Sequence, residues 1–180
     1  MTNPESVLHF WFEEIQPAAW WKKDAAFDAL IVQRFGAVLD SARAGELHAW
    51  RESAAGALAE IIVLDQFSRN IFRDSAAAFA QDTLALVLAQ EALRRGLDMQ
   101  LAEKQRHFLY MPYMHSESRA IHAEAVQLFT ALGDASVLDF EMQHKAIIDR
   151  FGRYPHRNAV LGRVSTAEEI AFLATPGSSF

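Results

Sequence analysis

Apolar residues recur at three- and four-residue spacing along most of this chain, and no segment shows the alternation of a half-buried β-strand. One such apolar helix stripe is formed by Phe27, Leu30, Ile31, Phe35, Val38 and Ala42. Residues 55–72 continue the helical pattern and are apolar on every side at 61–64, which predicts a buried central helix. The pattern therefore predicts an all-α protein.

Residues that favour helix ends divide this pattern into about eight helices with short loops. Helix starts are predicted at Asn3 before Pro4, at Asp24, at Asp82, at Ser136, and at Ser165 and Thr166, which have Glu168 and Glu169 three residues further on as overlapping capping boxes. Helix ends are predicted at Gly45, Gly96, Gly133 and Gly152. Pro112 should kink or end a helix over residues 100–115. Helices joined by short loops pack as antiparallel neighbours, and we expect a single all-helical domain over residues 1–180.

Composition excludes several classes of protein. The chain has no cysteine, so disulfides, thiolate metal sites and a cysteine nucleophile are excluded, and we expect a reducing, cytoplasmic location. The net charge of −6 argues against nucleic-acid binding, which needs a broad basic face. We expect neither a secretory signal nor a membrane span, because the longest apolar runs fall far short of about 20 residues.

The segment 144–163 is strongly basic within this acidic chain. It holds five Lys or Arg residues and one Asp, a net charge of +4. Turn chemistry explains Gly152, Pro155 and Asn158 but not the arginines. The predicted ligand-binding candidates in this segment are Arg150, Arg153, Arg157 and Asn158. A guanidinium fork fits a ligand carboxylate or phosphate, but it equally fits helix carbonyls or acidic residues of the chain such as Asp65 or Glu117.

A second polar group lies in the segment 65–73. Asp65, Arg69 and Arg73 fall at positions i, i+4 and i+8 of one helix face, and Gln66 and Asn70 flank them. Two structural interpretations are open, an exposed intrahelical ladder and a buried set of pairs. The third interpretation makes these five residues, together with Glu117, the wall of a ligand pocket.

Three histidines are candidates for proton transfer: His144, His115 and His156. His144 shares a helix face with apolar residues, so we expect it to be buried, and burial lowers the pKa of an imidazole. Ser116 follows His115 but lacks the Gly-x-Ser-x-Gly elbow of hydrolases, and capping of the next helix is its expected role. Glu141 and His144 match half of a di-iron pattern whose other half is missing, so we expect no metal and no cofactor.

Several motifs of this chain together resemble a largely bacterial family, the domain of unknown function 924. They are VLHFWF, LDQFSRNIFR, FLYMPYMHSES, RFGRYPHRNAVLGR and the C-terminal PGSSF, in this order from about residue 6 to 180. The resemblance implies an all-helical fold similar to tetratricopeptide repeats, with helix pairs stacked in a right-handed solenoid. It implies no established activity. Ser68 departs from the family pattern, in which proline often occupies this position.

Three functional interpretations remain at this stage. The first is a helical binding protein whose cationic pocket takes an anionic small molecule or a peptide carboxylate, and we favour it slightly. The second is an enzyme in which a histidine transfers protons and arginines hold an anion. The third is a polar cluster with a purely structural role. The first two require the segments 65–73, 106–117 and 144–158 to meet in space, and the sequence specifies no oligomeric state.

Overall fold

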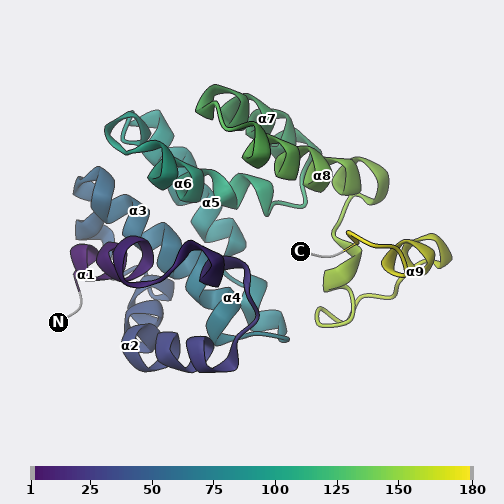
Figure 1. Ribbon diagram of the computed structural model, residues 1–180, viewed down its shortest axis with the longest axis horizontal. Coiled ribbons are helices and arrows are strands. Elements are labelled where there is room, and N and C mark those ends of the chain that lie inside the picture. Colours follow the sequence, from purple (N-terminus) through teal and green to yellow (C-terminus); the bar gives the residue numbers. More distant parts are fainter. Residues whose placement is uncertain (1–2, 179–180) are drawn as a thin grey trace. The chain divides into compact units, whose positions relative to one another are not determined.

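The computed structural model describes residues 3–178, and every regular element in this range is helical, which confirms the all-α prediction (Figure 1). The chain divides into two compact units. The first consists of the residues up to Arg73 together with Ala77–Pro112, and the second of Asp74–Ala76 together with the residues from Tyr113 on. The expected single domain and the expected right-handed solenoid stay predictions. Of the PGSSF motif, residues 179 and 180 lie outside the described range.

The α-helices between residues 3 and 178 are labelled in chain order. They are α1 (Pro4–His9), α2 (Ala25–Arg43), α3 (Ala54–Ile62), α4 (Ser68–Ile71), α5 (Asp82–Arg94), α6 (Glu103–Met114), α7 (Arg119–Leu132), α8 (Ala135–Phe151) and α9 (Ala167–Leu173). Short 3-10 helices cover Pro17–Trp21, His48–Glu52, Ala76–Phe79, Asp98–Gln100 and Pro155–Arg157. Two π-helical turns, Phe10–Glu14 and Val63–Phe67, continue α1 and α3 without a break.

The central helix of the first unit is buried as expected, but it is not uniform. Between α3 and α4 the π-helical turn Val63–Phe67 inserts a wider turn into the helix, which the sequence did not indicate. All five residues of this turn are buried. The side chain of Phe67 contacts the rings of Trp11 and Phe35, with centroids 5.5 and 4.8 Å apart. The core of the first unit is therefore aromatic where the two π-helical turns meet.

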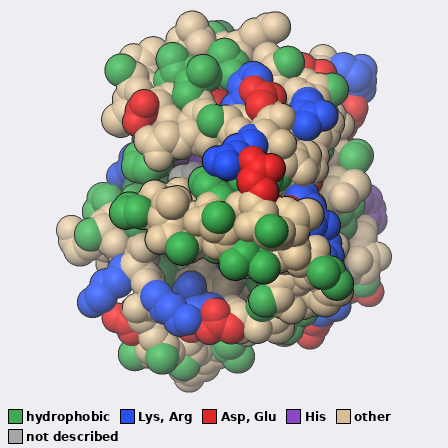
Figure 2. Space-filling model, turned by 90° about the vertical axis from the view of Figure 1, so that its right-hand side faces the viewer, with side chains coloured by type: hydrophobic (Ala, Val, Ile, Leu, Met, Phe, Trp, Pro, Cys, Tyr) green, Lys and Arg blue, Asp and Glu red, His purple; other side chains and the backbone are tan. Residues whose placement is uncertain are grey.

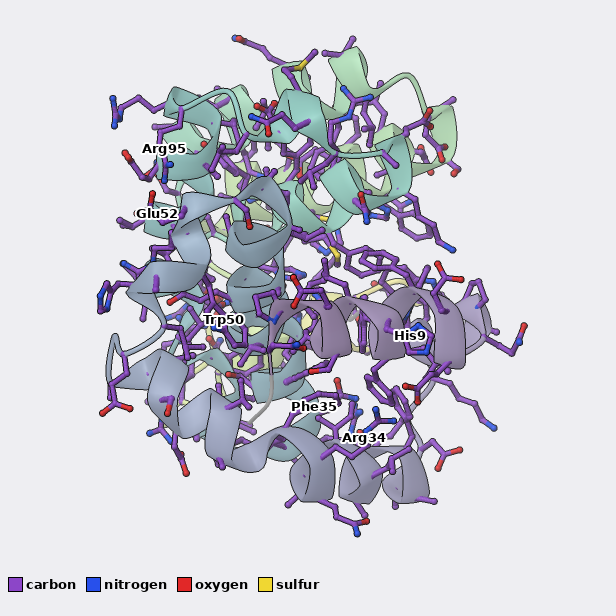
Figure 3. All side chains as sticks on the ribbon, turned by 90° about the vertical axis from the view of Figure 1, so that its left-hand side faces the viewer. His9, Arg34, Phe35, Trp50, Glu52 and Arg95 are labelled. Atoms are coloured by element: carbon purple, nitrogen blue, oxygen red, sulfur yellow. The ribbon has the colours of Figure 1, made fainter. Side chains whose placement is uncertain are left out.

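Helix α2 closes one side of this aromatic core. Asp24 caps it as predicted, because its carboxylate accepts the N–H groups of Ala26 and Phe27. The guanidinium of Arg34 lies 4.6 Å from the ring centroid of Phe10 and forms an ion pair with Glu14. Figure 3 shows this side of the unit, with Arg34 on α2 near α1. A charged side chain thus covers apolar surface while its charge is paired.

In the second unit, α7 and α8 form an antiparallel hairpin. Gly133 ends α7 in the left-handed conformation with φ 87°, as its position predicted. The prediction that Ser136 caps α8 was wrong by two residues. The carboxylate of Asp134 is the cap, and it accepts the N–H groups of Ser136 and Val137. The positive end of the helix dipole stabilises a negatively charged carboxylate more than a neutral hydroxyl.

Three further helix ends refine the predictions. Asp82 is the first helical residue of α5 and not its cap, because its carboxylate is engaged by Arg69 instead. Pro112 does not end α6, which continues to Met114. Thr166 and Glu169 form the predicted capping box of α9. At Asp82 a tertiary partner, Arg69, therefore binds the carboxylate that a local rule assigns to helix capping.

Gly56 provides a test of the packing in the first unit. A Cβ atom at this position would lie 1.9 Å from the carbonyl oxygen of Trp50, which belongs to the backbone and cannot rotate away. We expect Gly56→Ala to lower the free energy of unfolding by about 1–3 kcal/mol, as overpacking does. Urea denaturation measures the change.

Gly36→Ala is the matched control for that substitution. Gly36 lies inside α2, and a Cβ atom there would meet nothing within 4 Å. Alanine should therefore raise the free energy of unfolding by about 0.5–1 kcal/mol through helix propensity. Equal effects of the two substitutions would contradict the close approach at Trp50.

Candidate functional site

The segment 65–73 ends the central helix of the first unit, and its charges are paired. The guanidinium of Arg69 donates to both oxygens of Asp82 at 2.9 and 3.1 Å and to Asp65 at 3.2 Å. Asp65 is fully buried and also accepts a hydrogen bond from the amide of Gln66. A buried carboxylate requires such partners, since desolvation alone would disfavour its charge.

Asp28 on α2 holds the other end of this segment. Its carboxylate accepts from the guanidinium of Arg73 at 2.5 and 2.7 Å and from the amide of Asn70 at 2.8 Å. Burial raises the pKa of Asp28, but the hydrogen bonds from Arg73 and Asn70 outweigh it, so its pKa lies below the usual value. The predicted contact between Asp65 and Arg69 is present, whereas Arg73 pairs with a different helix. These contacts favour the buried-pair interpretation of the segment.

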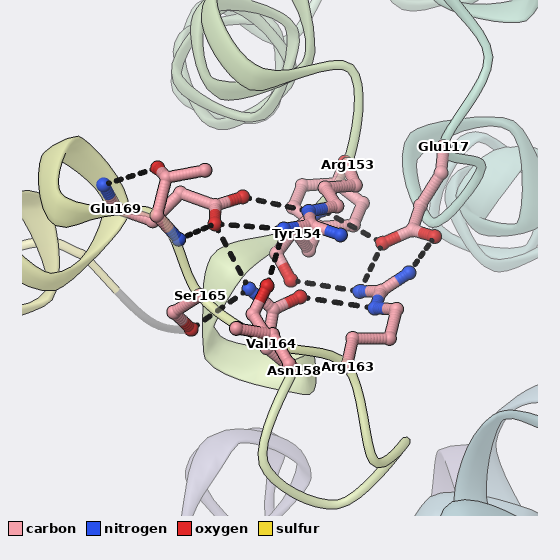
Figure 4. A network of polar contacts seen from close by, with 9 residues as sticks. Glu117, Arg153, Tyr154, Asn158, Arg163, Val164, Ser165 and Glu169 are labelled. Atoms are coloured by element: carbon pink, nitrogen blue, oxygen red, sulfur yellow. Dashed lines mark hydrogen bonds and ion pairs between the residues drawn. The ribbon is translucent and has the colours of Figure 1, made fainter.

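In the second unit a chain of polar contacts joins three segments (Figure 4). Glu117 accepts from the guanidinium of Arg163 at 2.7 and 2.9 Å and from the backbone N–H of Tyr154 at 2.7 Å. Arg163 also donates to the side-chain oxygen of Asn158 at 2.9 Å. Burial raises the pKa of Glu117, but these hydrogen bonds outweigh it and hold the pKa below the usual value.

The contact chain continues to α9 through Glu169. This carboxylate accepts from Arg153 at 2.7 and 2.8 Å, from the backbone N–H of Thr166 at 2.8 Å and from the amide of Asn158 at 3.3 Å. The fork of Arg153 lowers the pKa of Glu169 to about 2. The two hydrogen bonds of Arg153 therefore link the turn after α8 to the start of α9.

Arg150 is the most exposed arginine of the predicted set in the second unit. It pairs with Glu168, and the side chains of the two residues are 52% and 62% exposed. A pair in this position contributes little to stability. On the face shown in Figure 2, basic side chains likewise lie next to acidic ones.

Tyr154 is the centre of a different group. His144, His156 and Arg157 of this group were predicted site candidates, whereas Tyr154 itself and His122 were not. The Tyr154 ring is fully buried and lies near three imidazoles, with centroids 5.8 Å from His144, 5.5 Å from His156 and 6.3 Å from His122. The guanidinium of Arg157 lies 4.6 Å from the centroid of the same ring. We call Tyr154, His122, His144, His156 and Arg157 the Tyr154 cluster.

Arg157 and His144 are both largely buried in this cluster. Arg157 is 6% exposed and donates to the backbone carbonyl of His115 at 3.0 Å. The Nδ1 atom of His144 donates to the carbonyl of Phe140 at 2.7 Å. Burial lowers the pKa of His144 to about 3, and the positive charges of neighbouring histidines add to this shift. The expected burial of His144 is therefore present, and its ring is neutral at pH 7.

The charges that act on His144 come from three histidines, His115, His122 and His156. Three further imidazoles therefore lie within electrostatic range of His144 in the second unit. His115 and His156 are partly exposed, whereas His122 is fully buried. Basic groups so close to one another repel when they are protonated.

His122 and Glu141 form a buried pair that joins α7 to α8. The Nδ1 atom of His122 lies 2.7 Å from Oε1 of Glu141, and both side chains are fully buried. The sequence carried a signal for this pair. Both residues occupy polar positions within otherwise apolar helix stripes, as the buried residues Ala125 and Phe129 of α7 and Val137 and Ile148 of α8 show. Glu141 and His144 were compared only with a di-iron pattern, which was rejected, and the contact of Glu141 with the neighbouring helix was not predicted.

The structure brings residues 113–117 together with the segment 144–158 inside the second unit, through Glu117, His115 and Tyr154. The segments 65–73 and 106–112 belong to the first unit, and the meeting of all three stays a prediction. Ser116 does not cap α7. Its hydroxyl accepts the N–H of Ser118, which is the cap residue. Among residues 3–178, no three His, Asp or Glu side chains are arranged to hold a metal ion.

Comparison with known proteins places this all-helical chain in a family. The family described as a bacterial protein of unknown function, DUF924, matches residues 7–177, and the chain belongs to it. A similar solved structure is that of a protein of unknown function, ATU0120 from Agrobacterium tumefaciens, which is 40% identical in sequence. The match covers 95% of this chain and 96% of the ATU0120 chain, with a TM-score of 0.91. No curated protein matches significantly. Across residues 3–178, helix length and hydropathy do not reach what a membrane crossing needs.

Glu169 provides a test of the contact chain in the second unit. Its folded pKa of about 2 lies below its unfolded value, so its contribution is present above about pH 4.3 and is lost as the pH falls towards 2. Glu169→Gln removes the charge that Arg153 binds and should cost about 1.5–3 kcal/mol at pH 7. Urea denaturation of the wild type and Glu169→Gln, at pH 7 and at pH 3, measures the difference in their free energies of unfolding at each pH.

The difference in the free energy of unfolding between the wild type and Glu169→Gln should shrink between pH 4.5 and pH 2, because the unfolded wild-type chain takes up a proton at Glu169 there while the folded carboxylate stays ionised down to about pH 2. Glu168→Gln is the control, since its pair with Arg150 is exposed and should contribute less than about 1 kcal/mol. A constant difference across this pH range would contradict the assignment of the low pKa to Glu169.

Proposed function

We propose that this protein is a helical binding protein whose ligand is an anionic small molecule or a peptide carboxylate. The observation that supports this most directly is the Tyr154 cluster, in which basic side chains surround one buried tyrosine ring. An anion bound beside His115, His156 and Arg157 would offset the repulsion between these groups. Location in the cytoplasm, suited to a chain without cysteine, is part of the proposal.

The arginines of the other predicted positions fit the proposal less well. The forks of Arg69, Arg73 and Arg153 are occupied by Asp82, Asp28 and Glu169. A ligand anion there would have to displace a carboxylate of the chain that is already in bidentate contact. We centre the proposed site on Arg157, whose guanidinium lies against the Tyr154 ring and donates to the carbonyl of His115, and on the partly exposed residues His115 and His156.

The alternative of an enzyme with a histidine base rests on His144. Its Nδ1–H is donated to the carbonyl of Phe140, so the lone pair of the neutral ring lies on Nε2. With a pKa of about 3, however, His144 is a weak base at neutral pH. We therefore place binding ahead of catalysis, and turnover that is lost in His144→Gln while binding is retained would reverse this order.

Thermal unfolding in the presence of anions tests the proposal. We use inorganic phosphate and a panel of di- and tricarboxylates at pH 6 and pH 8. A ligand at about 100 times its Kd stabilises the folded state by about 2.7 kcal/mol, which should raise Tm by about 5 °C or more. The rise should be larger at pH 6, because protonated imidazoles attract the anion more strongly.

Arg157→Ala should abolish this rise in Tm, and His156→Gln should reduce it. Arg150→Ala is the matched control, because Arg150 is exposed and pairs with Glu168. If Arg157→Ala unfolds in the absence of ligand, His156→Gln and Arg157→Lys carry the test. A wild-type protein that responds to no anion, or variants with an unchanged response, would leave the polar cluster with a structural role only.

A further inference from the structure

His122 and Glu141 meet in the core of the second unit, and the distances around them restrict where hydrogens lie. On one side of the imidazole, Nδ1 is 2.7 Å from Oε1 of Glu141. On the other side, Nε2 is 2.9 Å from the backbone carbonyl oxygen of Ser116 and 3.2 Å from the hydroxyl of Tyr154. Both ionisable side chains are fully buried, so water cannot supply a missing partner from bulk solvent.

The Nε2 atom of His122 must carry a hydrogen. A carbonyl oxygen only accepts, so the contact with Ser116 requires a hydrogen on Nε2. Tyr154 cannot supply this hydrogen, because its hydroxyl donates to the carbonyl of Met114 at 2.6 Å. The tautomer of His122 is thereby fixed, with Nε2–H as the donor.

The contact between Nδ1 and Glu141 then needs a second hydrogen. With Nε2 protonated, a neutral imidazole has a lone pair on Nδ1, and a carboxylate oxygen 2.7 Å away would repel it. The hydrogen lies either on Nδ1, as imidazolium and carboxylate, or on Oε1, as neutral imidazole and carboxylic acid. Both arrangements contain the same atoms and carry zero net charge.

We propose that His122 and Glu141 share one proton through the neutral pH range, and that this proton is a structural part of the second unit. It fixes the imidazole that binds the carbonyl of Ser116, and it thereby positions residues 115–118, which lie between α6 and α7. Without the proton, either Nε2 or Nδ1 of His122 would face an acceptor with a lone pair.

The surroundings of the pair agree with a retained proton. The second oxygen of Glu141, Oε2, is buried and has no hydrogen-bond partner, an environment that disfavours a full negative charge. Burial accordingly raises the pKa of Glu141. The ionisable groups that act on the pair are Lys145 and His144 from α8 and Tyr154 from the following turn.

A retained proton has a definite effect on stability. In the unfolded chain Glu and His titrate near pH ~4.3 and ~6.5, so above about pH 6.5 the unfolded pair holds no proton. The folded pair holds one, and its contribution therefore falls as the pH rises, by about tenfold in the folding equilibrium constant for each pH unit. Below about pH 4.3 the unfolded pair holds two protons, and the contribution also falls.

Urea denaturation of the wild type and Glu141→Gln from pH 6 to pH 9 tests this inference. The amide of glutamine donates N–H to Nδ1 without taking up a proton, so the variant loses this pH dependence. Between pH 7 and pH 9 the wild-type equilibrium constant should fall about tenfold more per pH unit than that of the variant. Glu124→Gln, an exposed position on α7, should retain the wild-type dependence.

Equal pH dependence of the wild type and Glu141→Gln would overturn the proposal. If Glu141→Gln does not fold, nitrogen NMR of wild-type His122 at pH 7 decides. Protonation of Nε2, with Nδ1 either protonated or hydrogen-bonded to an acid proton, is the expected result. An unprotonated Nε2 would equally overturn the proposal.

Discussion

Glu117 ties the last part of the second unit to the start of α7. The hydrophobic cluster to which the last part of the chain contributes is small: it consists of Ile147 and Ile148 of α8 and of Tyr154, with Phe151 and Phe172 packed against them. The carboxylate of Glu117, with Arg163 and the backbone of Tyr154 as its partners, supplies the contacts that such a small core lacks. The side chains of Arg163 and Glu117 are only 24% and 27% exposed, so removal of one would leave the charge of the other poorly solvated and without this partner. The positions of the Tyr154 ring and of the groups around it follow from these contacts.

The helices were largely predictable from the sequence, because local rules determine them. Asn3, Asp24, Gly133 and Gly152 act at helix ends as their residue types indicate, and the apolar stripes identify the buried faces. The cap predictions at Ser136 and Asp82 were wrong. At the start of α8 the carboxylate of Asp134, two residues earlier, is the cap. At the start of α5 the carboxylate of Asp82 pairs with Arg69, a contact that a local rule does not include.

The candidate site was predictable only as a set of residue types. The excess of arginine in 144–163 signals that carboxylates or anions must be near, but it does not say which. Asp28, Asp82 and Glu169 are far from their arginines in sequence, and only the packing of helices brings them together. The contact between His122 and Glu141, in contrast, could have been predicted from the sequence. Polar residues within apolar stripes of two helices joined by a short turn are a readable signal for a buried contact.

The π-helical turn Val63–Phe67 has a consequence for how this family can vary in length. A π turn holds one residue more than an α turn, so a deletion of one residue here would restore a regular helix. Because a π turn and an α turn each make one full turn of the helix, the residues after the deletion would keep their direction around the helix axis, and Arg69 and Arg73 would still face Asp82 and Asp28. A deletion within the regular helix α3 would instead rotate every later residue by about 100° and turn both arginines away from their carboxylates. The π-helical turn is therefore the place where this helix can lose one residue and keep both ion pairs.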